Sequence, residues 1–184
     1  MKNFASILFF IISTMGMAQN ENSLPYYEIP NTPESYSAGT VAARMVDGLG
    51  FRYYWATEGL RETDLNYKPS ESGRTCGETI DHILGLSTFV LNSLSEEKRK
   101  TVSDNLSFEE KRELTLQNLK VASDILKTTD DLSKFDNDSF PFWNLINGPI
   151  EDAVWHCGQV VMLRRASGNP FTSKVSLFSG KLKE

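Results

Sequence analysis

The chain has few residues that could carry metal or nucleophilic chemistry. Its 184 residues include only two histidines, His82 and His156, and only two cysteines, Cys76 and Cys157. Asp152 stands four residues before His156, and this spacing places two side chains next to each other on one face of a helix, as two metal ligands from one helix require. So few histidines and cysteines exclude zinc fingers, iron–sulfur clusters and a small disulfide framework. The pattern indicates one small site instead.

The segment around His156 has polar side chains where a bundle helix would place its core. One stripe of this helix consists of Leu145, Pro149, Asp152, His156, Gln159 and Leu163. Because an unpartnered polar group in a core is costly, the polar row predicts a site. We expect His82 to join Asp152 and His156 from the inward face of a facing helix, with Gln159 hydrogen-bonding to the site from one turn beyond. The alternative is a hydrogen-bonded Asp152–His156 pair within one helix, with His82 a satisfied core residue.

Proline placement and apolar spacing indicate the helices that must position these residues. No proline occurs at positions 34–68 or 70–140, and such windows allow long helices. The predicted helices cover 37–59, about 75–94, the segment from the Ser107 cap to just before Asp130, and the segment from Pro149 to Ser167. The fold class is therefore an all-α four-helix bundle, with loops at 95–105 and 129–141 and one short strand at 175–178.

Caps and aromatic residues bear on the site as well. Thr75 and Glu78 have the spacing of a capping box at the start of the helix that carries His82. Glu78 therefore has two competing roles, as a cap or as a hydrogen-bonding neighbour of the site, and we favour the cap. The aromatic residues of the predicted helices are interpreted as core and pocket wall rather than as chemistry, namely Tyr53, Tyr54, Trp55 and Trp155.

The first 18 residues have the features of a secretory signal peptide. Lys2 supplies the positive charge, residues 4–17 are apolar, and the small residues Gly16 and Ala18 suit a cleavage site. The apolar stretch is shorter than the roughly 20 residues that span a bilayer, although an uncleaved anchor is the alternative. We expect an exported protein, periplasmic or secreted, without a membrane span after cleavage.

The remaining chain divides into three parts. Three prolines lie in a polar arm at 19–36, which we expect to extend over the surface. The bundle occupies 37–172, and a C-terminal tail occupies 173–184. With 40% hydrophobic and 23% charged residues and a net charge of −5, the composition is that of one globular domain. Its acidic balance gives no support to nucleic-acid binding, which requires a basic face.

The two cysteines raise the question of a disulfide, because an even number in an exported chain suggests one. Cys76 precedes His82 by six residues, which is about 9 Å along a helix axis, whereas Cys157 lies next to the ligand level. A disulfide needs Cα atoms within about 7 Å. We therefore predict two free thiols, with Cys157 packed between helices.

Two blocks of the sequence resemble the DinB-like (DinB/YfiT) superfamily. They are Gly73-Arg74-Thr75-Cys76-Gly77-Glu78-Thr79-Ile80-Asp81-His82-Ile83-Leu84 and Ile150-Glu151-Asp152-Ala153-Val154-Trp155-His156-Cys157-Gly158-Gln159. With the segment 164–170 and the intervening lengths, the resemblance covers 37–172. It implies a four-helix bundle with a divalent metal held by three histidines, two of which match His82 and His156. Asp152 occupies the position of the third, and Cys157 replaces an arginine of the family pattern. Aspartate is a competent metal ligand.

The resemblance and the donor set together imply a function. A site of two histidines and one carboxylate suits one divalent ion, which could be zinc, nickel, iron or manganese, and leaves coordination positions open. We expect a metal-dependent hydrolase or a thiol transferase that acts on a small molecule. The alternatives are a non-enzymatic metal- or ligand-binding or stress-response bundle, or a protein whose acidic surface and proline-rich arm serve a protein partner. A homodimer is left open.

Overall fold

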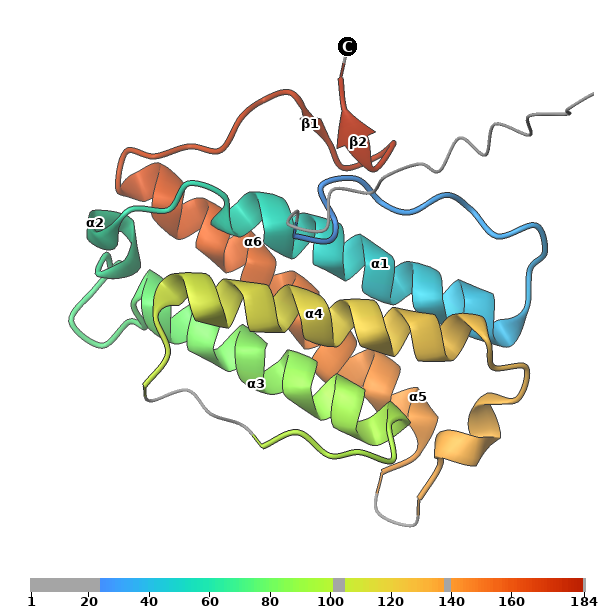
Figure 1. Ribbon diagram of the computed structural model, residues 1–184. Coiled ribbons are helices and arrows are strands. Elements are labelled where there is room, and N and C mark those ends of the chain that lie inside the picture. Colours follow the sequence, from blue (N-terminus) through green and yellow to red (C-terminus); the bar gives the residue numbers. More distant parts are fainter. Residues whose placement is uncertain (1–23, 101–104, 138–139, 184) are drawn as a thin grey trace, which may run out of the picture.

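Four long helices form a bundle in the computed structural model, which describes residues 24–100, 105–137 and 140–183 (Figure 1). They are α1 (Ala38–Thr57), α3 (Cys76–Leu94), α4 (Phe108–Lys127) and α6 (Glu151–Ala166). α1 and α3 lie diagonally, because each of them packs against both α4 and α6. The predicted all-α four-helix bundle is confirmed.

Ion pairs fix the relative directions of the helices. Lys111 near the start of α4 lies 2.6 Å from Asp81 near the start of α3, so these two helices run the same way. Arg112 from the same end of α4 pairs with Glu58 at the end of α1, so α1 runs the opposite way. The end of α3 and the start of α4 therefore lie at opposite ends of the bundle, as Figure 1 shows.

Local capping explains where three of the long helices begin. Ser37, Thr75 and Ser107 each accept a hydrogen bond from the backbone of the third helical residue in a reciprocal capping box. The backbone N–H of Thr75 donates to Glu78 at 2.7 Å, and this bond holds the pKa of the Glu78 carboxyl below its usual range. Glu78 is a cap, as favoured from the sequence.

The core fills the space between the four helices. Its largest fully buried side chains are Leu49, Phe51, Tyr53, Ile80, Ile83, Leu84, Leu91, Leu116, Leu119, Leu126, Leu145 and Ile150. They come from all four sides of the bundle, and burial of this apolar surface holds the helices in place. Tyr53 is part of this core, as expected, whereas Phe51 and Trp55 are buried in a separate cluster with Val175.

The fourth helix begins earlier than the sequence predicted. α5 (Phe142–Leu145), a π-helical turn η2 (Ile146–Ile150) and α6 follow one another without a break, so Pro149 lies inside the π turn rather than at a helix start. Proline lacks the N–H that an α-helix needs and crowds the carbonyl four residues earlier. In a π turn the hydrogen bonds join residues five apart instead of four, so the carbonyl four residues before Pro149 is not required to accept a bond from it and the helix continues through the proline.

Short elements appear where the sequence predicted loops or a single strand. α2 (Glu62–Leu65) precedes α3, and a 3-10 turn η1 (Leu132–Phe135) lies in the expected loop at 129–141. In the tail, β1 (Val175–Ser176) pairs antiparallel with β2 (Lys181–Leu182). The predicted strand at 175–178 is thus shorter, and it has a partner that the pattern did not reveal.

The arm is anchored rather than merely extended over the surface. Residues 24–36 contain no helix or strand, but Tyr26 is only 4% exposed. Its ring lies against Gly50 of α1, where an added Cβ would come within 2.4 Å of the ring, and its hydroxyl donates to Asp47 at 3.1 Å. The expectation of a surface arm is wrong at this residue, because the glycine leaves a notch that a tyrosine fills.

The predicted signal peptide at 1–18 lies outside the described residues. Among the helices of the described ranges, none is both long and apolar enough to cross a membrane.

Candidate metal centre

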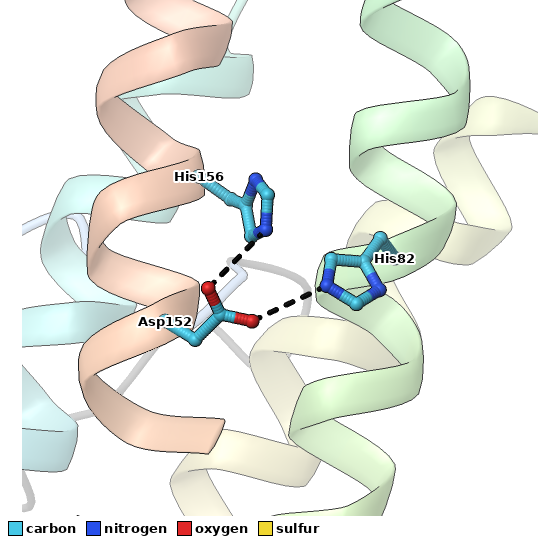
Figure 2. Close-up of side chains that lie close together, drawn as sticks. All are labelled: His82, Asp152 and His156. Atoms are coloured by element: carbon cyan, nitrogen blue, oxygen red, sulfur yellow. Dashed lines mark hydrogen bonds and ion pairs between the residues drawn. The ribbon is translucent and has the colours of Figure 1, made fainter. Parts of the chain in front are cut away.

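Three side chains converge between α3 and α6, as Figure 2 shows: His82 from α3, and Asp152 and His156 from α6. Each carboxylate oxygen of Asp152 faces one imidazole. Oδ2 lies 3.3 Å from Nε2 of His82, and Oδ1 lies 3.4 Å from Nε2 of His156. One ligand atom from each side chain lies within 4.8 Å of the other two. The three residues singled out from the sequence therefore form one cluster.

The cluster lies at the edge of the core and not on its inner face. The buried stripe of α6 consists of Ala153, Cys157, Val160 and Arg164, one residue beyond each member of the polar row. The side chains of His82 and Asp152 are 35% and 42% exposed, and that of His156 is 13% exposed. The expectation that this polar row faces the core is therefore wrong. The row borders the interface of α6 with α3, where its polar groups keep contact with water.

A hydrogen bond to Gln159 fixes the orientation of the His156 ring. Nδ1 of His156 lies 2.7 Å from the amide oxygen of Gln159. Because this oxygen only accepts, Nδ1 donates, and Nε2 is the ring nitrogen that faces Asp152; in a neutral ring this Nε2 carries the lone pair. A metal-binding histidine commonly has its other ring nitrogen bonded in this way. Gln159 thus lies where the sequence analysis expected it.

The donor atoms fit a divalent cation. An Nε2 lone pair and a carboxylate oxygen that face each other repel unless positive charge lies between them. Both contacts of Asp152 are longer than the roughly 2.7–2.9 Å of a charge-assisted N–H···O bond. Two imidazole nitrogens and one carboxylate oxygen are ligands that zinc and other first-row divalent ions accept.

A groove of about 790 Å³ opens beside His156. Its wall combines apolar, aromatic and cationic side chains, namely Pro69, Arg74, Thr79, Trp155, His156, Gly158, Gln159, Met162 and Leu163. Trp155 is 73% exposed, so it is pocket wall as predicted but not core. The sequence analysis did not identify Arg74 or Met162 as groove residues, because nothing in their spacing distinguishes them from ordinary surface positions.

A buried arginine holds α6 against α1. The guanidinium of Arg164 donates to the carbonyls of Ala56 and Glu58 at 2.9 Å each, and to that of Asn169 at 2.7 Å. Burial lowers the pKa of Arg164. The carbonyls at the end of α1 lack partners within their own helix, so this arginine satisfies them and sets the position of the helix that carries Asp152 and His156.

Asp64 of α2 ties the same end of the bundle together. Its buried carboxylate accepts hydrogen bonds from Arg61 at 2.8 Å, from Asn169 at 2.6 Å and from the hydroxyl of Ser167. The Arg61 guanidinium, with the other donors, holds the pKa of Asp64 well below its usual range. The segment after α6 is therefore fastened to the short helix before α3.

Both cysteines are free and buried, as predicted. Burial raises the pKa of Cys76 to about 11 and that of Cys157 to about 12. The raised pKa values favour the neutral thiol at physiological pH, whereas nucleophilic attack and metal binding require the thiolate.

Comparisons of the chain with family models, with curated proteins and with solved structures find no significant match.

Proposed function

We propose that this protein binds one divalent cation through His82, Asp152 and His156 and uses it to transform a small molecule in the adjoining groove. The observation that carries the proposal is the approach of three donor atoms to within 4.8 Å of one another, one of them from His156, which also lines a groove of about 790 Å³. Three protein ligands leave coordination positions open, which is typical of catalytic rather than structural sites.

Each side chain has a role that follows from its contacts. Nε2 of His82 and Nε2 of His156 donate lone pairs, and the carboxylate of Asp152 supplies one negative charge. Gln159 holds the proton of His156 on Nδ1 and keeps Nε2 free. When bound, a divalent ion supplies the positive charge that lowers the pKa of a water or a thiol and polarises a carbonyl.

The groove supports a substrate with both an apolar and an anionic part. Trp155, Met162 and Leu163 offer an apolar surface next to His156, and Arg74 offers a cation on the same wall. Pockets that bind small molecules usually combine such apolar lining with a few polar groups that fix orientation. We therefore propose hydrolysis of small esters or amides, with thiol transfer as the second candidate.

The resemblance to the DinB-like superfamily supports this proposal through the positions of His82 and His156, and we propose that the chain is a divergent member in which Asp152 replaces a histidine. The pattern of residues 1–18 supports export. Outside the cytoplasm low-molecular-weight thiols are scarce, whereas water is available, so export favours hydrolysis over thiol transfer.

A substrate screen tests the proposal. Chelator-stripped protein, before and after reloading with Zn²⁺, Ni²⁺, Fe²⁺ or Mn²⁺, is assayed with 4-nitrophenyl esters, 4-nitroanilides, and glutathione with 1-chloro-2,4-dinitrobenzene. We expect turnover that requires metal and is lost in Asp152→Ala. The matched control is Glu151→Ala, which removes the neighbouring exposed acid of the same helix turn and keeps the activity. Metal binding without turnover of any substrate class contradicts the enzymatic proposal and favours the metal-binding bundle.

A further inference from the structure

A second cavity lies on the other flank of α6, where α6, α1 and the C-terminal segment meet. It has a volume of about 340 Å³. α1 contributes Arg52, Trp55 and Ala56, and the C-terminal segment contributes Phe171 and Leu177. This segment runs back from the end of α6 over the α1 side of the bundle (Figure 1). The cavity therefore has three walls drawn from distant parts of the chain.

The inside of this cavity is apolar, and packing among its lining residues fixes the positions of its walls. Trp55 belongs to a separate core cluster with Phe51 and Val175, against which Phe171 packs. Cys157 lines the cavity as a buried thiol that is only 2% exposed. The β1–β2 hairpin carries Val175 and so holds the C-terminal wall in place. The cavity is thus a formed pocket.

Two arginines supply positive charge at this apolar site. Nη1 of Arg52 donates to the carbonyl of Gly48 at 2.9 Å, and the guanidinium of Arg165 lies 5.6 Å from the centre of the Phe171 ring. Arg61 and Arg112 form ion pairs with carboxylates, whereas among the described residues no carboxylate lies within ion-pair distance of Arg52 or Arg165. In a chain of net charge −5, the two arginines thus leave positive charge without an acidic partner beside one apolar pocket.

We infer that this cavity binds a small apolar molecule with one anionic group, such as an aromatic or short-chain carboxylate, held by Arg52 and Arg165. The volume is at the lower end of the roughly 300–1,000 Å³ of small-molecule pockets, so the ligand has one or two rings or a short acyl chain. Guanidinium groups bind carboxylates through paired N–H donors. This site contains none of His82, Asp152 and His156, and it adjoins the groove beside His156, with which it shares the lining residues Gly158 and Met162.

Binding of 2-naphthoate and its neutral isostere 2-naphthamide tests the inference. Isothermal titration calorimetry of the full chain is carried out with a chelator present, so that no metal contributes. We expect naphthoate to bind at least tenfold more tightly than naphthamide. Arg52→Gln and Arg165→Gln each remove a cation, and each weakens naphthoate binding about tenfold while leaving naphthamide binding unchanged.

A third variant distinguishes this cavity from the groove beside His156. Arg74→Gln removes a cation of the groove, and we expect it to leave naphthoate binding unchanged. Equal affinities for the two compounds, absence of naphthoate binding, or a loss with Arg74→Gln but not with Arg165→Gln would overturn the inference. Circular dichroism of each variant confirms that it is folded, and Arg165 is exposed, so its replacement leaves the core intact.

Discussion

Replacing Gln159 by leucine removes the partner of the His156 ring while keeping the size of the side chain. In the wild-type protein the amide oxygen of Gln159 accepts the Nδ1 proton of His156 at 2.7 Å. Without this bond the proton is free to occupy Nε2, the atom that faces Asp152, and the ring is free to turn. The bond is exposed to solvent, so its net value lies near the usual 0.5–1.5 kcal/mol of a protein hydrogen bond.

This value converts directly into metal affinity. Since about 1.4 kcal/mol corresponds to a tenfold change in an equilibrium constant, we expect Gln159→Leu to weaken metal binding by about threefold to tenfold. Gln159→Glu keeps an acceptor and adds a negative charge, so its affinity is expected to equal or exceed that of the wild type.

Competition against a chromogenic chelator at constant pH measures these affinities with Zn²⁺. The matched control is Gln117→Leu, which replaces another exposed glutamine that bonds within its own helix, in this case to Glu113. Its metal affinity should be unchanged. The reasoning is refuted if Gln159→Leu binds as tightly as the wild type, or if Gln159→Glu is as weak as Gln159→Leu.

Three further predictions concern stability and the thiols. Gly48→Ala should raise the free energy of unfolding by up to about 1 kcal/mol through helix propensity, because its methyl group meets only the flexible end of the Arg52 side chain, at 3.3 Å. Gly50→Ala should lower the free energy of unfolding by about 2 kcal/mol, because its methyl group meets the Tyr26 ring at 2.4 Å. Urea denaturation that gives both changes the same sign would contradict this prediction. Asp64→Asn should cost about 1–2 kcal/mol near pH 7. Arg61 holds the pKa of Asp64 well below its unfolded value. This stabilisation is therefore fully present above about pH 4 and declines as the pH falls towards the folded pKa, so the difference in stability between variant and wild type should narrow steadily from pH 4 to pH 2 in denaturation curves. Thiol titration in denaturant without reductant should find two free thiols per chain, and native protein should react slowly because both thiols are buried; finding none would show a disulfide.

The sequence predicted the bundle well because its signals are local. Three of the four long helices begin at a serine or threonine that caps the helix, and two of these caps, Thr75 and Ser107, were identified from the sequence, whereas the Ser37 cap was not. The start of the fourth helix was wrong because Pro149 suits a first helical turn, and a π turn inside a continuous helix leaves no pattern in the sequence.

The residues of the site were predicted from spacing within one helix, but how deeply they are buried was not. Asp152 and His156 are neighbours in any helix, so their pairing was accessible from the sequence. Whether the row of Asp152 and His156 faces the core or its edge depends on how α6 is rotated about its own axis relative to α3. The two orientations differ by one residue, which is a rotation of about 100°. The burial of Tyr26 was not predicted for a similar reason, because its ring packs against Gly50, which is distant in the sequence.

The metal content of the purified protein tests the central claim most directly. Protein stripped with a chelator is dialysed against equimolar mixtures of Zn²⁺, Ni²⁺, Fe²⁺ and Mn²⁺ under anaerobic conditions and analysed by inductively coupled plasma mass spectrometry. The account predicts close to one ion per chain in the wild type and in Glu151→Ala, and loss of the ion in His82→Ala, Asp152→Ala and His156→Ala. Equal, substoichiometric metal in the wild type and in His82→Ala would contradict it.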